Sequence, residues 1–288
     1  MVFTLRKLIV RFNYKNGYTY TAKNVPITVV IEDVYDQIYG KAHVQIMGIP
    51  YSAMTNLTLL SYIHSEIGEN EISVYAQNGD GVETPIFLGS VMSASANFNS
   101  SPDVEFHVEA ASCGKERLRV VDTTTINSTD NVKTIDAIQK LVNQTKAPHF
   151  TLKDNGVTGT ITGQWQGSPI GQIEQICNQR HLKMSVDAIN RIISISPEGY
   201  KGTVTGLVIS SQTGLIGYPT IDDKGVSLRC FYNPLLRAGT LFYLKSIVPC
   251  ATAEWSIATA THHLSSGNPN GSVWETQITA KYSSQWEG

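Results

Sequence analysis

The chain has 288 residues, of which 16% are charged and 41% are hydrophobic, and its formal net charge is -2. This charged fraction is well below the ~25% of an ordinary soluble domain, and the near-zero net charge excludes a large basic field for gripping nucleic acid. The low charge suits a protein that buries surface against partners, and it equally suits a large β core. The length predicts two or three domains at roughly 100–200 residues each.

The four cysteines lie far apart in the sequence, so there is no CxxC pair and no zinc-ribbon spacing. They are Cys113, Cys177, Cys230 and Cys250. We expect four small buried side chains in a reducing compartment. The first residues alternate like a strand and do not resemble a signal peptide. No apolar run approaches the ~18 residues that span a membrane, so we predict no membrane insertion.

Alternating apolar and polar residues predict short strands through most of residues 1–112. Glycine, proline and the turn Asn78–Gly81 separate these strands. The expected strands include 8–14, 18–22, Ile27–Val34, Lys41–Ile49, Glu71–Gln77, Pro85–Ser95 and Val104–Ala110. Such a series favours a barrel or a sandwich. Residues 50–65 are less regular, and their apolar residues (Met54, Leu57, Leu60 and Tyr62) fit either a short helix or a loop.

Residues 113–200 change to a mixed pattern. Helical spacing of isoleucine, leucine and valine predicts a helix over Thr134–Thr145, capped by Asp130 or Thr134 and closed by Pro148. Strands are expected near residues 150–152 and 156–165. A second helix begins at Ser168-Pro169, with serine as N-cap and proline at the first helical position. A hairpin over residues 183–196 completes a small α+β module.

Residues 201–288 return to strands. Val226, Leu228, Cys230 and Tyr232 alternate with polar neighbours after a turn at Asp222–Gly225. Pro234 ends that strand, and we expect the chain to turn at Gly239 and return over residues 240–248 as a hairpin. Two further strands are predicted around Trp255 and Trp274. No sequence repeat joins the first and last regions, although both are rich in strands.

The sequence contains few residue patterns that indicate a catalytic or binding site. No P-loop is present, and Gly79-Asp80-Gly81 lies in a hairpin turn, where a dinucleotide site is not expected. No G-x-S-x-G elbow nominates a nucleophilic serine. We therefore predict a protein that is not an enzyme, with no catalytic, cofactor-binding or metal-binding residue and no cofactor.

Three pairs or clusters could suggest metal sites, and each has a plainer interpretation. His262 and His263 are neighbours in a strand and point to opposite faces, so they cannot chelate together without a bulge. Asp222 and Asp223 fit a turn beside Gly225. The third cluster is Glu32, Asp33 and Asp36, which lacks the calcium-loop pattern and fits a solvated strand end.

The order of these regions, with short motifs spread along nearly the whole chain, resembles the baseplate hub proteins of bacteriophages with contractile tails. More distantly, the chain is similar to late-control-D proteins and to the base of type VI secretion spikes. In the first region the motifs are Ala42–Ile49, Met54, Glu71–Gln77, Ile86–Val91 and Pro102-Asp103. In the last region they are Gly217-Tyr218-Pro219, Gly225-Val226, Asn233-Pro234, Gly239, Lys245-Ser246, Trp255, His262-His263-Leu264 and Trp274-Glu275-Thr276.

The resemblance implies a mainly β protein in which two tail-tube-like β-barrel domains, residues 1–112 and 201–288, flank a central α+β domain, residues 113–200. It implies a structural, homotrimeric symmetry adaptor in which two barrels per chain give six in a ring. The expected partners are the hexameric tail tube protein and the trimeric central spike, with baseplate wedge and tape-measure proteins as further candidates. The expected location is the virion tail baseplate, assembled in the host cytoplasm, and sequence-specific nucleic-acid contacts are not expected.

Two other functions compete with this hypothesis. A β-rich carbohydrate- or receptor-binding module of a tail tip would need exposed aromatic residues for stacking. The candidates are Trp165, Trp255, Trp274 and Trp286. A cell-wall hydrolase is the third hypothesis, and the sequence offers no pair of acidic residues in a helical lysozyme-like context to support it.

Overall fold

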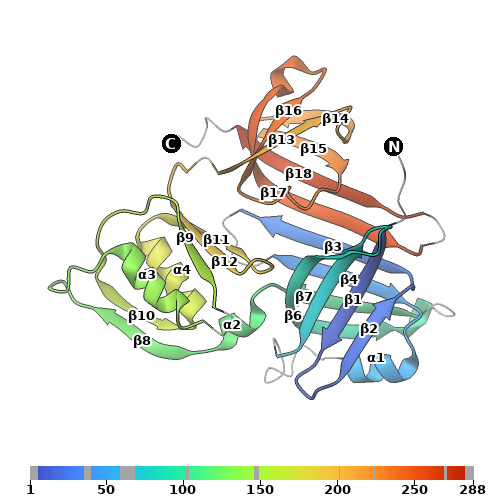
Figure 1. Ribbon diagram of the computed structural model, residues 1–288, viewed down its shortest axis with the longest axis horizontal. Coiled ribbons are helices and arrows are strands. Elements are labelled where there is room, and N and C mark those ends of the chain that lie inside the picture. The colour runs from blue at the N-terminus through green and yellow to red at the C-terminus, as the bar shows by residue number, and fades with distance from the viewer. Residues whose placement is uncertain are drawn as a thin grey trace.

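The computed structural model describes residues 6–35, 40–58, 69–100, 104–145, 149–200, 202–223, 225–268 and 271–282. Three bodies are visible (Figure 1): an N-terminal unit of strands at the lower right, a C-terminal unit of strands above it, and a middle module with two packed helices at the left. The prediction of a mainly β protein is confirmed.

The N-terminal unit is built from strands whose inward residues alternate with exposed ones, as the sequence predicts. Its elements are β1 (Lys7–Asn13), β2 (Thr19–Lys23), β3 (Ile27–Val34), β4 (Lys41–Met47), α1 (Tyr51–Leu57), β5 (Glu71–Gln77), β6 (Glu83–Asn97) and β7 (Glu105–Ala111). The strands pair in the order β2-β1-β5-β6-β7-β4-β3. Helix α1 settles the open choice at residues 51–57, whereas Leu60, Tyr62 and the Pro102-Asp103 motif lie outside the described residues.

The long strand β6 belongs to two layers of this unit. Its first half pairs with β5 and its second half pairs with β7, with a bulge between Val91 and Ser93. A bulge bends a strand, so the sheet folds over on itself and encloses a core. Buried residues from both layers, such as Phe12 of β1 and Phe106 of β7, meet in that core.

The middle module packs two helices against short strands. Its elements are α2 (Gly114–Leu118), β8 (Val121–Ile126), α3 (Thr134–Val142), β9 (Thr151–Asp154), β10 (Gly163–Gly167), α4 (Pro169–Gln179), β11 (Leu182–Asp187) and β12 (Ile192–Pro197). Ser168 caps α4 as predicted, because its hydroxyl accepts a hydrogen bond from the Gly171 amide at 3.1 Å. The predicted cap of α3 is wrong, since the N-cap is Lys133 and makes no side-chain cap bond.

The C-terminal unit contains six strands and a core of its own. These are β13 (Thr203–Ser210), β14 (Leu215–Asp222), β15 (Gly225–Phe231), β16 (Thr240–Lys245), β17 (Ala253–Ser266) and β18 (Trp274–Tyr282). Their order is β14-β15-β18-β17-β16-β13. The predicted hairpin of residues 226–248 is wrong: β15 is flanked by β14 and β18, so β16 pairs with β13 and β17 instead.

The two units are joined by pairing between β3 and β17, which makes one sheet of 13 strands. The predicted closed barrels are not found in the described part of the chain. A barrel in the N-terminal unit would require β3 to pair back on β2, but β3 uses its second edge on β17. In the C-terminal unit, β13 and β14 likewise do not pair with each other.

The described residues form three hydrophobic clusters. They draw on residues 8–110 together with Leu264, on residues 113–195, and on residues 209–280. A domain division at residues 112 and 200 stays a prediction, because a continuous sheet crosses from the first region to the last. Among the described residues, no helix combines the length and the apolar character needed to cross a membrane.

Candidate functional site

The two β units share one strand order. If β2 is set aside, the N-terminal strands in space are β1-β5-β6-β7-β4-β3, and the C-terminal strands are β13-β16-β17-β18-β15-β14. Numbered along the chain within each unit, both orders are first, fourth, fifth, sixth, third and second. One pairing differs in direction: β1 and β5 are antiparallel, whereas β13 and β16 are parallel.

The correspondence extends to the register of individual residues. The bulge of β17, between Ile257 and Thr259, matches the bulge of β6, and a buried serine precedes each bulge by one residue, Ser90 in β6 and Ser256 in β17. Rows of paired residues that cross each sheet from the bulge also match. They are Val91, Ala110, Ala42 and Ile31 in the N-terminal unit, and Ile257, Ala280, Val226 and Ile221 in the C-terminal unit.

The junction of the units is an antiparallel ladder of eight residue pairs, from Thr259 opposite Val34 to Ser266 opposite Ile27. Side chains reinforce it: the Asp33 carboxylate accepts a hydrogen bond from the Ala238 amide at 3.1 Å. Leu264 of β17 packs into the core of the N-terminal unit and is 1% exposed. The junction therefore has a hydrogen-bonded ladder and an apolar seal, which are the features of a permanent interface.

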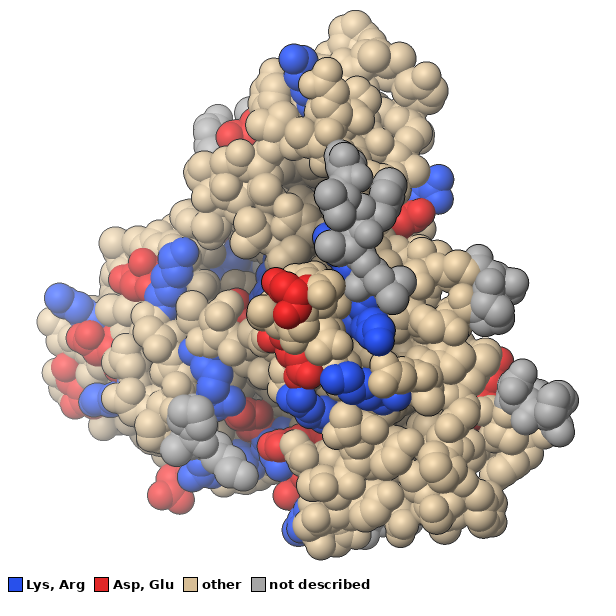
Figure 2. All heavy atoms as spheres, turned by 45° about the vertical axis from the view of Figure 1, so that its right-hand side comes forward, with Lys and Arg blue, Asp and Glu red and all other residues tan. Residues whose placement is uncertain are grey.

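The sheet face opposite the cores is polar and carries charges of both signs. Along β4 and β7 the residues on this face include His43, Gln45, His107 and Glu109, and along β15 and β18 they include Ser227, Arg229, Gln277 and Thr279. Basic and acidic side chains also lie intermixed in the view of Figure 2, which shows no large area of one sign. Such a surface lacks the basic stripe of a nucleic-acid-binding protein.

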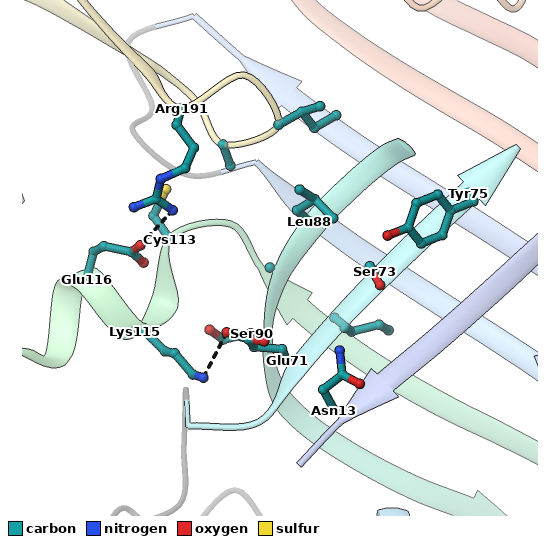
Figure 3. Close-up of a pocket in the computed structure, with 14 residues that line it drawn as sticks. Asn13, Glu71, Ser73, Tyr75, Leu88, Ser90, Cys113, Lys115, Glu116 and Arg191 are labelled. Atoms are coloured by element: carbon teal, nitrogen blue, oxygen red, sulfur yellow. Dashed lines mark hydrogen bonds and ion pairs between the residues drawn. The ribbon is translucent and has the colours of Figure 1, made fainter. Parts of the chain in front are cut away.

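A cavity of about 350 Å³ lies where the middle module meets β5 and β6 of the N-terminal unit. Figure 3 shows that its charged side chains point toward one another in two pairs. Lys115 Nζ lies 2.8 Å from Glu71 Oε1, and Arg191 Nη1 lies 3.2 Å from Glu116 Oε1. The first pair ties the middle module to β5. A third ion pair, between Arg237 and Asp187 at 2.9 Å, ties the module to the C-terminal unit.

The chemistry of this cavity favours a structural contact. All four charged residues that line it are engaged in the two ion pairs. The thiol of Cys113 also faces the cavity, and burial raises its pKa to about 12. A thiol with that pKa stays protonated near neutral pH and is a poor nucleophile. The charged groups of the cavity are therefore paired with one another, and the Lys115–Glu71 ion pair holds the middle module against β5.

The histidine pair behaves as the strand geometry predicts. His262 is 6% exposed, and its Nδ1 lies 2.9 Å from the Thr276 hydroxyl, whereas His263 is only half-buried, on the other face. Burial lowers the pKa of His262 to about 4. Within the described residues, no group of three or more His, Cys, Asp and Glu side chains is placed to hold a metal ion.

The acidic candidates serve turns and the junction. Asp222 and Asp223 are exposed at the turn between β14 and β15. Asp33 is half-buried at the junction, and desolvation of its carboxyl there raises its pKa. Gly79-Asp80-Gly81 forms the predicted hairpin turn, where the Asp80 carboxylate accepts a hydrogen bond from the Val82 amide at 3.1 Å. Asp36 lies outside the described residues.

The three tryptophans in the described part of the chain do not form an exposed stacking surface. Trp165 is 4% exposed and Trp255 is 3% exposed, and the indole N–H of each donates a hydrogen bond inside the protein. Trp274 is half-buried and packs against the N-terminal core. Trp286 lies outside the described residues. Because sugar stacking needs an accessible ring face, the carbohydrate-binding alternative loses these three residues.

Cysteine burial was predicted for all four residues and holds for three of them. Cys113, Cys177 and Cys230 are buried and free, and burial raises the pKa of each thiol to about 12. The prediction is wrong for Cys250, which is exposed in the short 3-10 turn Pro249–Ala251.

Comparison with known proteins gives one family and several similar folds. The family model described as baseplate hub gp41 matches residues 7–270, whereas no curated protein sequence matches the chain. The 43 kDa tail protein of prophage MuSo2 from Shewanella oneidensis is 10% identical with a TM-score of 0.60, over 96% of this chain and 98% of that one. The tail protein from Neisseria meningitidis MC58 is 10% identical with a TM-score of 0.61, over 97% and 98%.

A secretion protein has a similar fold. The E. coli c3393 protein is a component of the type VI secretion system and exhibits structural similarity to the T4 bacteriophage tail proteins gp27 and gp5. It is 12% identical to this chain with a TM-score of 0.59, over 92% of this chain and 75% of that one. At such low identity these likenesses show a shared fold.

Proposed function

The chain belongs to the baseplate hub gp41 family, and from that premise we propose that three copies form a ring that joins a sixfold tail tube to a threefold central spike. Membership makes the chain a structural component of the phage tail baseplate. The ring, its symmetry and its partners are the proposal. The role is structural and requires no catalytic group.

One observation carries the proposal: each chain contains two β units with the same strand order and a matching register across the sheet at their bulges. Three chains would therefore present six similar units around one axis, which matches the symmetry of a hexameric tube. The middle modules occur once per chain and would keep the ring threefold on the side that meets a trimeric spike. A closed ring of this kind is the ordinary outcome of head-to-tail contacts whose rotation closes.

The polar face of the sheet supports the same arrangement. If the continuous sheet lines the ring, its side chains of mixed charge would face the lumen. DNA could then pass without the phosphate contacts and counterion release that make tight binding. Each interface between chains should be large, at ~2,000 Å² or more, as in obligate assemblies.

Light scattering on the purified full-length chain tests the proposal. The measurement is made on the chain alone and again with the tail tube protein and the spike protein of the same phage. We expect a species that contains three copies of the 31.6 kDa chain, either alone or in a complex whose mass also includes these partners. A chain that remains monomeric under both conditions contradicts the proposal.

A further inference from the structure

The junction inside the chain uses two particular edges. The outer edge of β3 pairs with the second half of β17, residues 259–266. In the matched strand orders, β14 is the counterpart of β3, and the second half of β6 is the counterpart of that half of β17. Each chain therefore carries a second copy of both edges.

These second copies have no strand partner in the described part of the chain. β14 pairs only with β15, so its outer edge ends the sheet. β6 pairs with β5 as far as Ser90, and beyond Val91 its only strand partner is β7. An unpaired strand edge presents backbone donors and acceptors to any strand that fits.

Side-chain exposure separates the covered edges from the uncovered ones. Leu264 lies five residues beyond the Thr259 that follows the bulge of β17 and is 1% exposed, because the N-terminal core covers it. The residue at the matching distance is Phe98, five residues beyond Ser93, which lies in the 3-10 turn Phe98–Ser100 directly after β6 and is 56% exposed. On the other edge, Ile31 of β3 is 6% exposed, whereas its counterpart Ile221 of β14 is 37% exposed.

We propose that β14 of one copy pairs antiparallel with the second half of β6 of the next copy, and so repeats between chains the junction of β17 with β3. The register follows from the internal pairs of Glu32 with Thr261 and of Ile31 with His262. It places Asp222 opposite Ser95 and Ile221 opposite Ala96 of the neighbouring chain. The occupant is a second copy because this chain already contains both halves of the contact and joins them once within itself.

The pairing between chains is shorter than the internal one. In β14, residues 217–219 bulge away from β15, between the pairs at Ile216 and Thr220. β6 ends at Asn97, and the next position in this register would bring Phe98 of the 3-10 turn opposite Pro219, which has no backbone N–H, so the ladder ends there. A bulge and a proline on an edge strand also oppose indiscriminate pairing. The contact between chains therefore separates more readily than the eight-pair junction inside the chain.

This inference rests on the proposed ring and adds which edges close it. A disulfide experiment on the full chain, in a Cys250→Ser background, tests it. The variant Ser95→Cys with Asp222→Cys places two thiols on one sheet face in neighbouring copies. With the tube and spike proteins present and a mild oxidant added, we expect covalent dimers and trimers of the chain on a non-reducing gel.

Two further cysteine pairs serve as negative and positive controls for the crosslinking. Ser95→Cys with Ile221→Cys shifts one thiol by a single residue and moves it to the opposite face, so crosslinking should fall about tenfold. Thr261→Cys with Glu32→Cys reproduces the pair inside one chain and should oxidise without any gain in mass. Trimers that form without the Ser95–Asp222 crosslink overturn the edge pairing and leave the proposed function standing. Persistent monomers overturn both.

A second variant, without introduced cysteines, tests the same contact through its effect on self-association. Phe98→Asp places a charge in the proposed seal and should weaken self-association at least about tenfold, as expected for an interface anchor, while the thermal midpoint of the monomer stays unchanged. Leu118→Asp is the control, since Leu118 is 52% exposed and lies in α2 of the middle module, outside both edge strands. Equal association of the two variants contradicts the proposal.

Discussion

The N-terminal and C-terminal units repeat a backbone pattern and fill it with different side chains. The residue before the buried serine of each bulged strand is Gly89 in β6 and the buried Trp255 in β17. Near the far end of the sheet, the pair of Ala96 with Phe106 corresponds to the buried pair of His262 with Thr276. The hydrogen-bonded register can therefore stay constant while each core is packed independently, so no sequence repeat is visible.

A second contrast lies at the edges of the two units. The internal junction covers β3 and the end of β17, whereas their counterparts β14 and the end of β6 end without a strand partner in the described residues. Two units with the same strand order thus differ in what covers them. That asymmetry is expected when one contact is made within the chain and the matching contact is made between chains.

The largest expected effect separates the two cores. Phe106→Ala removes a fully buried ring from the N-terminal core and should lower the free energy of unfolding by about 3–5 kcal/mol. At the corresponding position, Thr276→Ala removes a small side chain and the hydrogen-bond partner of His262, which should lower it by about 1–3 kcal/mol. Urea unfolding measures both, and equal losses would show that the two positions do not differ in packing.

The next largest expected effect is a dependence of the free energy of unfolding on pH, which arises from His262 in the C-terminal unit. The pKa of His262 falls from its ordinary 6.5 to about 4 because the ring is buried. The unfolded chain therefore binds more protons than the folded chain between these values, and stability is lost as the pH falls through that window. The loss from this group amounts to about 3 kcal/mol by pH 4.

His262→Gln removes this titration, and its unfolding free energy should decline less steeply between pH 6.5 and pH 4 than that of the parent chain. Asp33 acts in the opposite sense. Its pKa is raised by burial, so its contribution diminishes as the pH rises above the ordinary value of 3.8. Because Asp33 is present in both proteins, its contribution cancels from the difference. Parallel pH curves for the two proteins would rule out His262 as the source.

The smallest expected change in the free energy of unfolding comes from the first residue of β15, for which the first residue of the matching strand β4 is the control. Gly225 opens β15 at φ +135°, and a Cβ there would collide with the carbonyl oxygen of Ala280. Gly225→Ala should therefore lower the free energy of unfolding by about 1–3 kcal/mol. The matched control is Lys41→Ala at the exposed start of β4, where we expect a change within about 0.5 kcal/mol. If both variants unfold at the same urea concentration, the backbone constraint is absent.

Local sequence signals predicted many of the elements. Strict alternation identified β1, β4, β7 and β15, and Ser168-Pro169 marked the start of α4. Strands β13 and β14 were missed because glycines at 206, 214 and 217 and the proline at 219 interrupt the alternation. Strand β8 was missed as well, since its run of threonines gives no apolar period.

The sequence did not allow us to predict which strands, distant in the chain, pair with each other. A hairpin of β15 with β16 is the simplest expectation for neighbours in the chain, yet β14 and β18 occupy both edges of β15. The prediction of closed barrels failed for the same reason, because β3 pairs with a strand more than 200 residues away. Alternation indicates that a strand has two faces, but it does not indicate which strand meets its edge.

The central claim is that one chain supplies two equivalent wall segments, and electron microscopy of the hub assembled with its tube and spike partners tests it most directly. Averages viewed along the axis should show six β lobes around a lumen, alternating between two slightly different kinds, with three outer modules. A ring with only three lobes around the lumen, or particles in which the two units do not lie at equal radius, would contradict the claim.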